Sequence, residues 1–216
     1  VLKIAKSSNV PIVTISTDKA VKPSSVLGLT KRISEILCLK FNNSKFSSKV
    51  VRFGNVFGSV GSAVPTFINQ INNKLPITIT NKKVTRFFMT TNEACFLLLS
   101  SLRLNKVNNV LVLNMGKPIK ILDIINSLIK IRKRIEPDYN HEIKEIGLTR
   151  GEKMHEILTL KKKLIKTKNP NINIVTDPTY KNENIDKLLM KLKKNNNVRI
   201  LVKSMKDFLS KDFNIK

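Results

Sequence analysis

Short apolar segments rich in β-branched residues alternate with amphipathic helical segments along most of this sequence. Residues 11–16 (PIVTIS), 48–53 (SKVVRF) and 110–116 (VLVLNMG) have the length and composition of buried strands. Between the first two, residues 25–41 place apolar side chains at helical spacing and begin with a Ser that suits a helix N-cap. Strands separated by helices of about 10–15 residues are typical of α/β proteins, so we predict a parallel sheet covered by helices.

The last quarter of the chain has a different character. It is rich in Lys and Asn and holds one clear amphipathic segment, ENIDKLLMKLKK (183–194). We therefore predict an α/β domain over residues 1–158 and a peripheral helical tail over residues 159–216. The KKNNN run (193–197) is predicted as a loop, and GEKMHEILTL (151–160) is predicted to begin a helix.

A formal net charge of +25 raises the question of a nucleic-acid partner. Nearly all of the excess is Lys, and it comes with abundant Asn and Ile, a bias that AT-rich codons produce without any partner. The sequence has no zinc finger, no basic stripe interleaved with aromatic residues and no RNA-binding signature. We expect weak, sequence-independent adhesion to polyanions and no dedicated nucleic-acid partner.

Metal sites, disulfides and membrane spans find little support in the sequence. Cys38 and Cys95 lie in apolar helical patterns and are predicted to be reduced core thiols. His141 and His155 have no partners at ligand spacing, so no metal site is predicted. No apolar run approaches the roughly 20 residues of a membrane span. The first 13 residues resemble the end of a helix running into a strand rather than a signal peptide, so the chain is expected to begin within a domain.

The stretch STDKAVKPSSVLGLTK (16–31) gathers several reactive side chains around one turn. Thr17, Asp18 and Lys19 follow the first predicted strand directly, and loops at the carboxyl ends of parallel strands carry the chemistry of open α/β sheets. Leu27 and Lys31 come four residues apart in the next predicted helix, so they share one face of it. An adjacent acid and base suit a reaction that needs both.

Five motifs give the chain a resemblance to one family. The motifs are STDKAVKPSSVLGLTKR, VVRFGNVFGSVGSAVPTF, VTRFFMTTNEA, LNMGKPIKILDI and GLTRGEKMHE. Their order and spacing resemble those of nucleotide-sugar 4,6-dehydratases, the CapD-like polysaccharide-biosynthesis proteins of the extended short-chain dehydrogenase class. The resemblance runs to about residue 158. It implies a Rossmann-type parallel sheet that lacks its N-terminal half, with a small substrate-binding subdomain from parts of residues 55–90 and 115–158.

The resemblance implies catalytic roles for the residues around the first turn. A 4,6-dehydratase takes hydride from sugar C4, eliminates water across C5 and C6, and returns the hydride to C6. By resemblance, Lys19 is the C5 base, Asp18 protonates the leaving C6 hydroxyl, and Thr17 bonds near the C4 oxygen. Lys31 holds the nicotinamide ribose, and Leu27 adjoins it in the cofactor site. Members of the class carry Tyr or Met at the Leu27 position. Because Leu cannot exchange a proton, the C4 hydroxyl proton leaves through Thr17, water or Lys31.

The resemblance also implies substrate-binding residues. Asn55 approaches the nucleotide diphosphate, and Arg86 faces the phosphates, where a guanidinium fork binds well. Glu152 is a partner for the ribose or uracil. The common family motif reads Arg-Pro-Gly-Glu-Lys, whereas Thr149 stands here at the Arg position and Arg150 at the Pro position. This departure leaves the role of Arg150 open.

The expected cofactor is NAD or NADP. The glycine-rich phosphate-binding turn of the family does not precede these motifs, and the residue that selects between the two cofactors is missing with it. A fragment of a longer chain or a broken gene would each explain this, and the intact motifs favour a fragment.

The sequence thus predicts part of an NAD(P)-dependent UDP-sugar 4,6-dehydratase, acting on UDP-N-acetylglucosamine for bacterial capsule or related surface-polysaccharide synthesis and inactive as an isolated piece. A nucleotide-sugar epimerase, an inverting 4,6-dehydratase/5-epimerase and a non-catalytic remnant are the alternatives. The complete protein is expected to be a homo-oligomer in the cytoplasm. It would meet the inner face of the membrane only through its missing N-terminal region.

Overall fold

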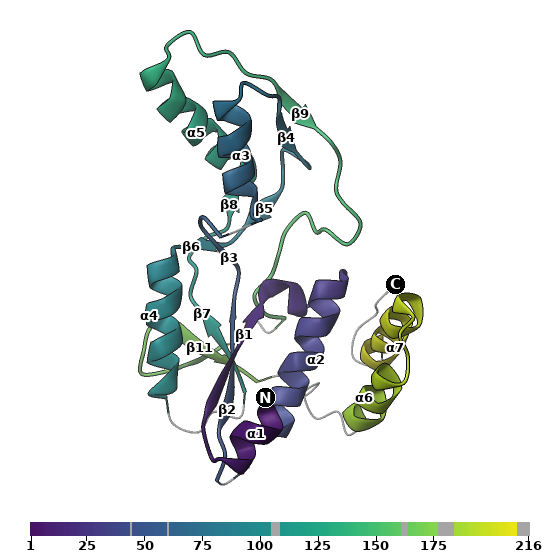
Figure 1. The fold of residues 1–216 in the computed structure, drawn as a ribbon. Helices are drawn as coiled ribbons and strands as arrows, with labels where there is room; N and C mark the ends of the chain where they lie inside the picture. The colour runs from purple at the N-terminus through teal and green to yellow at the C-terminus, as the bar shows by residue number, and fades with distance from the viewer. Residues whose placement is uncertain (44, 60, 105–108, 161–163, 177–183, 211–216) are drawn as a thin grey trace. The chain divides into compact units, whose positions relative to one another are not determined.

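The computed structural model describes residues 1–43, 45–59, 61–104, 109–160, 164–176 and 184–210 (Figure 1). The chain forms two compact units. Unit 1 comprises Val1–Phe53, Phe96–Asn114 and Ile157–Lys216, and unit 2 comprises Gly54–Cys95 and Met115–Glu156. Unit 2 therefore consists of two stretches that fall close to those expected for a substrate-binding subdomain.

Unit 1 is an α/β unit around a five-stranded sheet with the order β1-β2-β7-β11-β10. Strands β1, β2 and β7 are parallel, whereas β11 runs antiparallel to both β7 and β10. The predicted parallel α/β sheet is confirmed. The elements of unit 1 are α1 (Leu2–Ser7), β1 (Ile12–Thr17), the 3-10 turn η1 (Asp18–Ala20), α2 (Val26–Lys40), β2 (Ser48–Phe53), β7 (Val110–Leu113), β10 (Ile165–Lys166), β11 (Ile172–Val175), α6 (Ile185–Lys193) and α7 (Val198–Ser210).

Helix α2 packs on one face of this sheet, and α6 and α7 pack beside it (Figure 1). Val50 of β2 and Val112 of β7 meet Ile33 and Ile36 of α2 in a core that Leu188 and Leu209 of the two C-terminal helices complete; all are nearly inaccessible to solvent. Alternation along the strands turns their other side chains to the opposite face. The chain has no Trp, and its core consists mainly of Ile, Leu and Val.

Helix α4 (Thr91–Leu102) begins in unit 2 and ends in unit 1. A reciprocal cap starts it: Thr90 Oγ1 accepts from the Glu93 backbone N–H, and Glu93 accepts from the Thr90 N–H. The Thr90 backbone N–H and, to a lesser degree, the Thr90 hydroxyl donate to the Glu93 carboxylate, and these two bonds hold the pKa of Glu93 below its usual value. At its other end, the buried Lys49 ammonium donates to the carbonyls of Ser101, Leu102 and Leu104. The last turn of the helix is thus satisfied by a side chain from β2.

The structure differs from the sequence prediction at three places. The segment after residue 158 is not only helical, because the apolar run Ile172–Val175 pairs with β7 and extends the sheet. The predicted helix at 151–160 is wrong: His155 forms a β-bridge with Thr85, and the backbone there is extended. Cys95 is exposed rather than part of the core, because α4 buries its opposite face; Cys38 is buried as expected.

Unit 2 is built from short strand pairs and two helices. Strand β4 pairs with β9 in parallel, β3 with β6 in parallel, and β5 with β8 antiparallel. Its core lies between the helices and β4, where Phe67, Ile77, Ile125 and Tyr139 are buried. The elements of unit 2 are β3 (Asn55–Val56), α3 (Ala63–Asn72), β4 (Ile77–Ile79), β5 (Thr85–Arg86), β6 (Phe88–Met89), β8 (Ile119–Lys120), α5 (Ile121–Ile135) and β9 (Ile143–Glu145).

The described residues contain neither a membrane-spanning helix nor a cluster of metal-binding side chains. None of the helices there combines the length and apolarity needed to cross a bilayer. Within the same residues, His, Cys, Asp and Glu side chains form no group of three or more that would suit a metal ion.

Candidate active site

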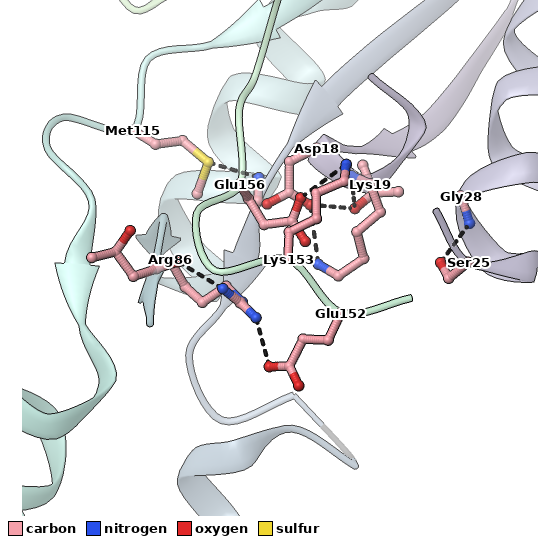
Figure 2. A network of polar contacts seen from close by, with 12 residues as sticks. Asp18, Lys19, Ser25, Gly28, Arg86, Met115, Glu152, Lys153 and Glu156 are labelled. Atoms are coloured by element: carbon pink, nitrogen blue, oxygen red, sulfur yellow. Dashed lines mark hydrogen bonds and ion pairs between the residues drawn. The ribbon is translucent and has the colours of Figure 1, made fainter. Parts of the chain in front are cut away.

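The turn after β1 joins three of the predicted catalytic residues through hydrogen bonds. Thr17 ends the strand, and its hydroxyl accepts weakly from the Lys19 backbone N–H at 3.4 Å, which starts the 3-10 turn. The same hydroxyl donates to Asp18 Oδ1 at 2.8 Å. Lys19 Nζ lies 3.0 Å from that oxygen (Figure 2). The Thr17 hydroxyl and the Lys19 ammonium therefore bind the same carboxylate oxygen of Asp18.

The Asp18 carboxyl group is buried, with no exposed surface, while the Lys19 side chain keeps 29% of its surface exposed. Oδ1 has both partners named above, but the second oxygen, Oδ2, has no hydrogen-bond partner among the described residues. Buried polar atoms are usually satisfied, so an unsatisfied carboxylate oxygen marks a place where a ligand or a proton would complete the bonding.

The beginning of α2 packs directly against this turn. Ser25 is the N-cap, and its hydroxyl accepts from the Gly28 N–H at 3.2 Å (Figure 2). A Cβ atom on Gly28 would lie 2.5 Å from the carbonyl oxygen of Lys19 and 3.2 Å from the Cα of Pro23. Because both are backbone atoms, no side chain can rotate away to make room. Gly28 is therefore the residue that lets α2 approach the turn.

Gly28→Ala should displace the turn and destabilise the fold by about 1–3 kcal/mol, the usual cost of overfilling a packed site. In an unobstructed helix the same change would stabilise, since Ala is the better helix former. The measurement is the urea midpoint at constant m-value, with Thr30→Ala on the exposed side of α2 as the control. An unchanged or raised midpoint would contradict the close contact.

Lys31 and Leu27 lie one turn apart on α2, as predicted. The Lys31 ammonium donates to the carbonyl of Ile15 near the end of β1 at 3.2 Å. The Leu27 side chain is 52% exposed. Lys31, a half-buried residue, and the exposed Leu27 side chain thus lie next to each other on one helix face, in the same unit as the Thr17–Asp18–Lys19 turn.

In unit 2 the structure joins Arg86 and Glu152, two of the predicted substrate-binding residues. Arg86 Nη2 lies 2.7 Å from Glu152 Oε1 (Figure 2). The Arg86 Nη1 group donates to the carbonyls of Thr85 and Met154. Glu152 Oε2 accepts from the N–H and hydroxyl of Thr149. Thr149, at the family's Arg position, therefore holds the carboxylate that pairs with Arg86.

Asn55 and Arg150 lie on other segments of unit 2. Asn55 begins β3, is half-buried, and donates its backbone N–H to the carbonyl of Phe87. Arg150 is exposed in the turn before Gly151. The predicted substrate-binding residues thus form one ion pair and two separate positions.

Two polar groups escaped the sequence analysis. Lys153 Nζ lies 3.4 Å from Glu156 Oε2, and neither atom has a hydrogen bond among the residues that the structure describes. Their spacing of three within GEKMHE would place them side by side in the predicted helix, but the pair forms here on a backbone that is not helical. The second group is centred on Glu35, a charged residue among the apolar positions of α2. Its carboxylate accepts hydrogen bonds from Ser16 and Arg52.

Comparison with known proteins decides the family. Residues 1–177 match the family model described as "Polysaccharide biosynthesis protein". The chain belongs to this family. It is 47% identical over 154 residues to the capsular polysaccharide biosynthesis protein CapD of Staphylococcus aureus, covering 70% of this chain and 25% of CapD. It is 42% identical over 152 residues to the probable polysaccharide biosynthesis protein EpsC of Bacillus subtilis (strain 168), covering 68% of this chain and 24% of EpsC. The resemblance to CapD-like proteins is confirmed, and the chain spans about a quarter of the length of these two relatives.

Other similar proteins extend the comparison. A UDP-glucose 4-epimerase of Rickettsia rickettsii (strain Sheila Smith) is 31% identical over 161 residues, covering 72% of this chain and 45% of the epimerase. Among solved structures, Pen from Bacillus thuringiensis has a TM-score of 0.74 at 32% identity, covering 82% of this chain and 56% of Pen. The dTDP-glucose 4,6-dehydratase of Bacillus anthracis, solved with NAD, has a TM-score of 0.62 at 13% identity and covers 73% and 56%. The last likeness concerns the fold alone, and the Rossmann-type α/β fold is confirmed.

Proposed function

We propose that the protein containing this chain is a nucleotide-sugar 4,6-dehydratase that converts UDP-N-acetylglucosamine to a UDP-4-keto-6-deoxy-N-acetylhexosamine for a surface polysaccharide. The observation that carries the proposal is the 3.0 Å contact between Lys19 Nζ and Asp18 Oδ1 at the carboxyl end of β1. Elimination of water from C5 and C6 needs a base and an acid close together, and this pair supplies both. Membership in the polysaccharide biosynthesis protein family supports the same reaction class.

One proton transfer between Lys19 and Asp18 would prepare both groups for the elimination. Moving a proton from Lys19 Nζ to the Asp18 carboxylate gives an amine and a carboxylic acid. The amine then removes the C5 proton, and the carboxylic acid protonates the C6 hydroxyl as it leaves as water. When hydride returns to C6, C5 would take a proton from the Lys19 ammonium, which regains one from water. The Thr17 hydroxyl donates to the same carboxylate and so keeps the Asp18 side chain oriented. Its oxygen can accept a hydrogen bond from the C4 hydroxyl of the sugar.

The reaction requires NAD or NADP, which accepts hydride from C4 and gives it back at C6. The residues of this chain fit the nicotinamide end of such a cofactor. The Lys31 ammonium stands beside the Ile15 carbonyl and suits ribose hydroxyls, while the exposed Leu27 offers an apolar surface to a ring. The motifs of this chain do not include the family's phosphate-binding turn, and we propose no choice between the two cofactors.

On the substrate side we propose that Arg86 and Asn55 bind the diphosphate, and that Glu152 binds the ribose or uracil. The Arg86–Glu152 ion pair orients the guanidinium before substrate arrives. Arg150, exposed two residues before Glu152 in the sequence, adds positive charge for a UDP-sugar. We further propose a homo-oligomer working on the cytoplasmic side of a bacterial membrane, where nucleotide sugars are made.

A second candidate is a nucleotide-sugar 4-epimerase, which the similarity to the Rickettsia rickettsii epimerase favours. Mass spectrometry separates the two. The complete protein, incubated with UDP-N-acetylglucosamine and either NAD or NADP, should yield a nucleotide sugar lighter by one water. A product of unchanged mass with inverted C4 would establish the epimerase instead.

A further inference from the structure

A buried carboxylate that the proposed chemistry does not use connects three elements behind the Thr17–Asp18–Lys19 turn. Glu35 of α2 has no exposed surface. Its Oε1 accepts from the Ser16 hydroxyl at 2.5 Å and from Arg52 Nε at 3.0 Å. Its Oε2 accepts from Arg52 Nη2 at 2.7 Å and from Arg32 Nη1 at 3.2 Å. Ser16, Arg32 and Arg52 are themselves at most 3% exposed.

The register of the sheet explains how one carboxylate reaches two strands. Ser16 of β1 and Arg52 of β2 are direct partners in the parallel ladder, so their side chains leave the same face side by side. Glu35 comes one helical turn after Lys31 and meets both from above that face. Ser16 is also the residue immediately before Thr17. The network therefore ends one peptide bond from the proposed catalytic turn.

The same network also binds the segment around Leu158. The remaining Arg52 nitrogen, Nη1, donates to the carbonyl of Leu158 at 3.1 Å. A bidentate Arg–carboxylate contact fixes direction as well as distance, because both groups are planar. Apolar side chains of similar volume often stabilise a core as well as a buried ion cluster does. What the ionic cluster adds is a defined orientation for β1, β2 and α2.

We propose that Glu35 and Ser16 are positioning residues for the dehydration chemistry. Through Ser16, Glu35 fixes the carboxyl end of β1 and so aims the Thr17 hydroxyl and the Asp18–Lys19 pair. Glu35 and Lys31 lie on the same helix, α2, so Glu35 also positions Lys31 against the carboxyl end of β1. The inference rests on the proposed function for its catalytic meaning, and on the hydrogen bonds alone for its structural meaning.

Ser16→Ala in the complete protein is the informative variant, because it leaves the Glu35–Arg52 pair in place. We expect kcat for dehydration to fall about tenfold while KM changes less than about twofold, since small misplacements of reacting groups cost rate rather than binding. Ser16→Thr, which restores a hydroxyl, should recover most of kcat. Amide hydrogen exchange of residues 17–21 should become faster in Ser16→Ala and return in Ser16→Thr.

Thr14→Val is the matched control. Thr14 lies two residues earlier on the same strand, and its hydroxyl contacts Cys38 of the same helix at 3.2 Å. It should leave kcat and the exchange of residues 17–21 unchanged. Equal losses in Thr14→Val and Ser16→Ala, or no recovery with Ser16→Thr, would overturn the inference. If the unaltered protein dehydrates no nucleotide sugar, the proposed function fails. The exchange comparison then still decides whether Ser16 and Glu35 position the turn.

Discussion

Lys19→Ala should slow formation of the 4-keto-6-deoxy sugar by about 10²–10⁴-fold, the usual loss when a positioned general base is removed. The reason is that the Lys19 Nζ atom, 3.0 Å from the Asp18 carboxylate at the end of β1, is the group proposed to remove the C5 proton. Oxidation at C4 does not need Lys19, so a bound substrate should still give the absorbance of reduced nicotinamide. Stopped-flow absorbance and product analysis of the complete protein would follow the two events separately.

Two other lysines serve as comparisons for this variant. Lys31→Ala should fail before any reduced nicotinamide appears, because Lys31 is assigned to the cofactor end of the site. Lys22→Ala removes an exposed ammonium three residues after Lys19 and should stay within about twofold of the unaltered rate. Turnover of Lys19→Ala at the unaltered rate would remove Lys19 from the mechanism. The Thr17–Asp18–Lys19 turn would then be a structural feature.

Glu35→Gln should lower the free energy of unfolding by about 3–5 kcal/mol, the typical cost of breaking a buried ion pair by removing one partner. The substitution keeps the side-chain volume but leaves the guanidinium groups of Arg32 and Arg52 buried without their carboxylate. The measurement is the urea midpoint together with the m-value, which should stay constant.

Asp186→Asn is the control for this loss of charge. Asp186 pairs with Lys40 of α2, but its side chain is 63% exposed, and pairs in water contribute little. Its effect on the midpoint should be within the error of the measurement. If Glu35→Gln behaved like Asp186→Asn, the buried network would not hold the strands as described.

Much of unit 1 could be predicted from local patterns. The β-branched run before Thr17 and the helical spacing after Ser25 each agree with the final fold, so β1 and α2 appear where expected. Strand β11 was missed because its four apolar residues lie in a Lys/Asn-rich stretch, and only pairing with β7 makes it a strand. Long-range pairing of this kind leaves a weak local signal.

The candidate site was predictable in its residues and less so in its contacts. The adjacency of Thr17, Asp18 and Lys19 placed them at one turn, and the 3-10 geometry of η1 brings their side chains together. The Arg86–Glu152 pair joins positions 66 residues apart, which no local spacing could reveal. Glu35 lies within the amphipathic helix predicted over residues 25–41, and only its contacts with Ser16 and Arg52 reveal it as a buried partner.

The most direct test of the account is the proposed reaction run in deuterium oxide with the complete protein and UDP-N-acetylglucosamine, followed by proton NMR. If Lys19 and Asp18 carry out the elimination, the product will be a 4-keto-6-deoxy sugar with deuterium at C5, and Lys19→Ala will slow both changes by about 10²–10⁴-fold. A product that keeps its C6 hydroxyl and its original C5 proton would contradict the account.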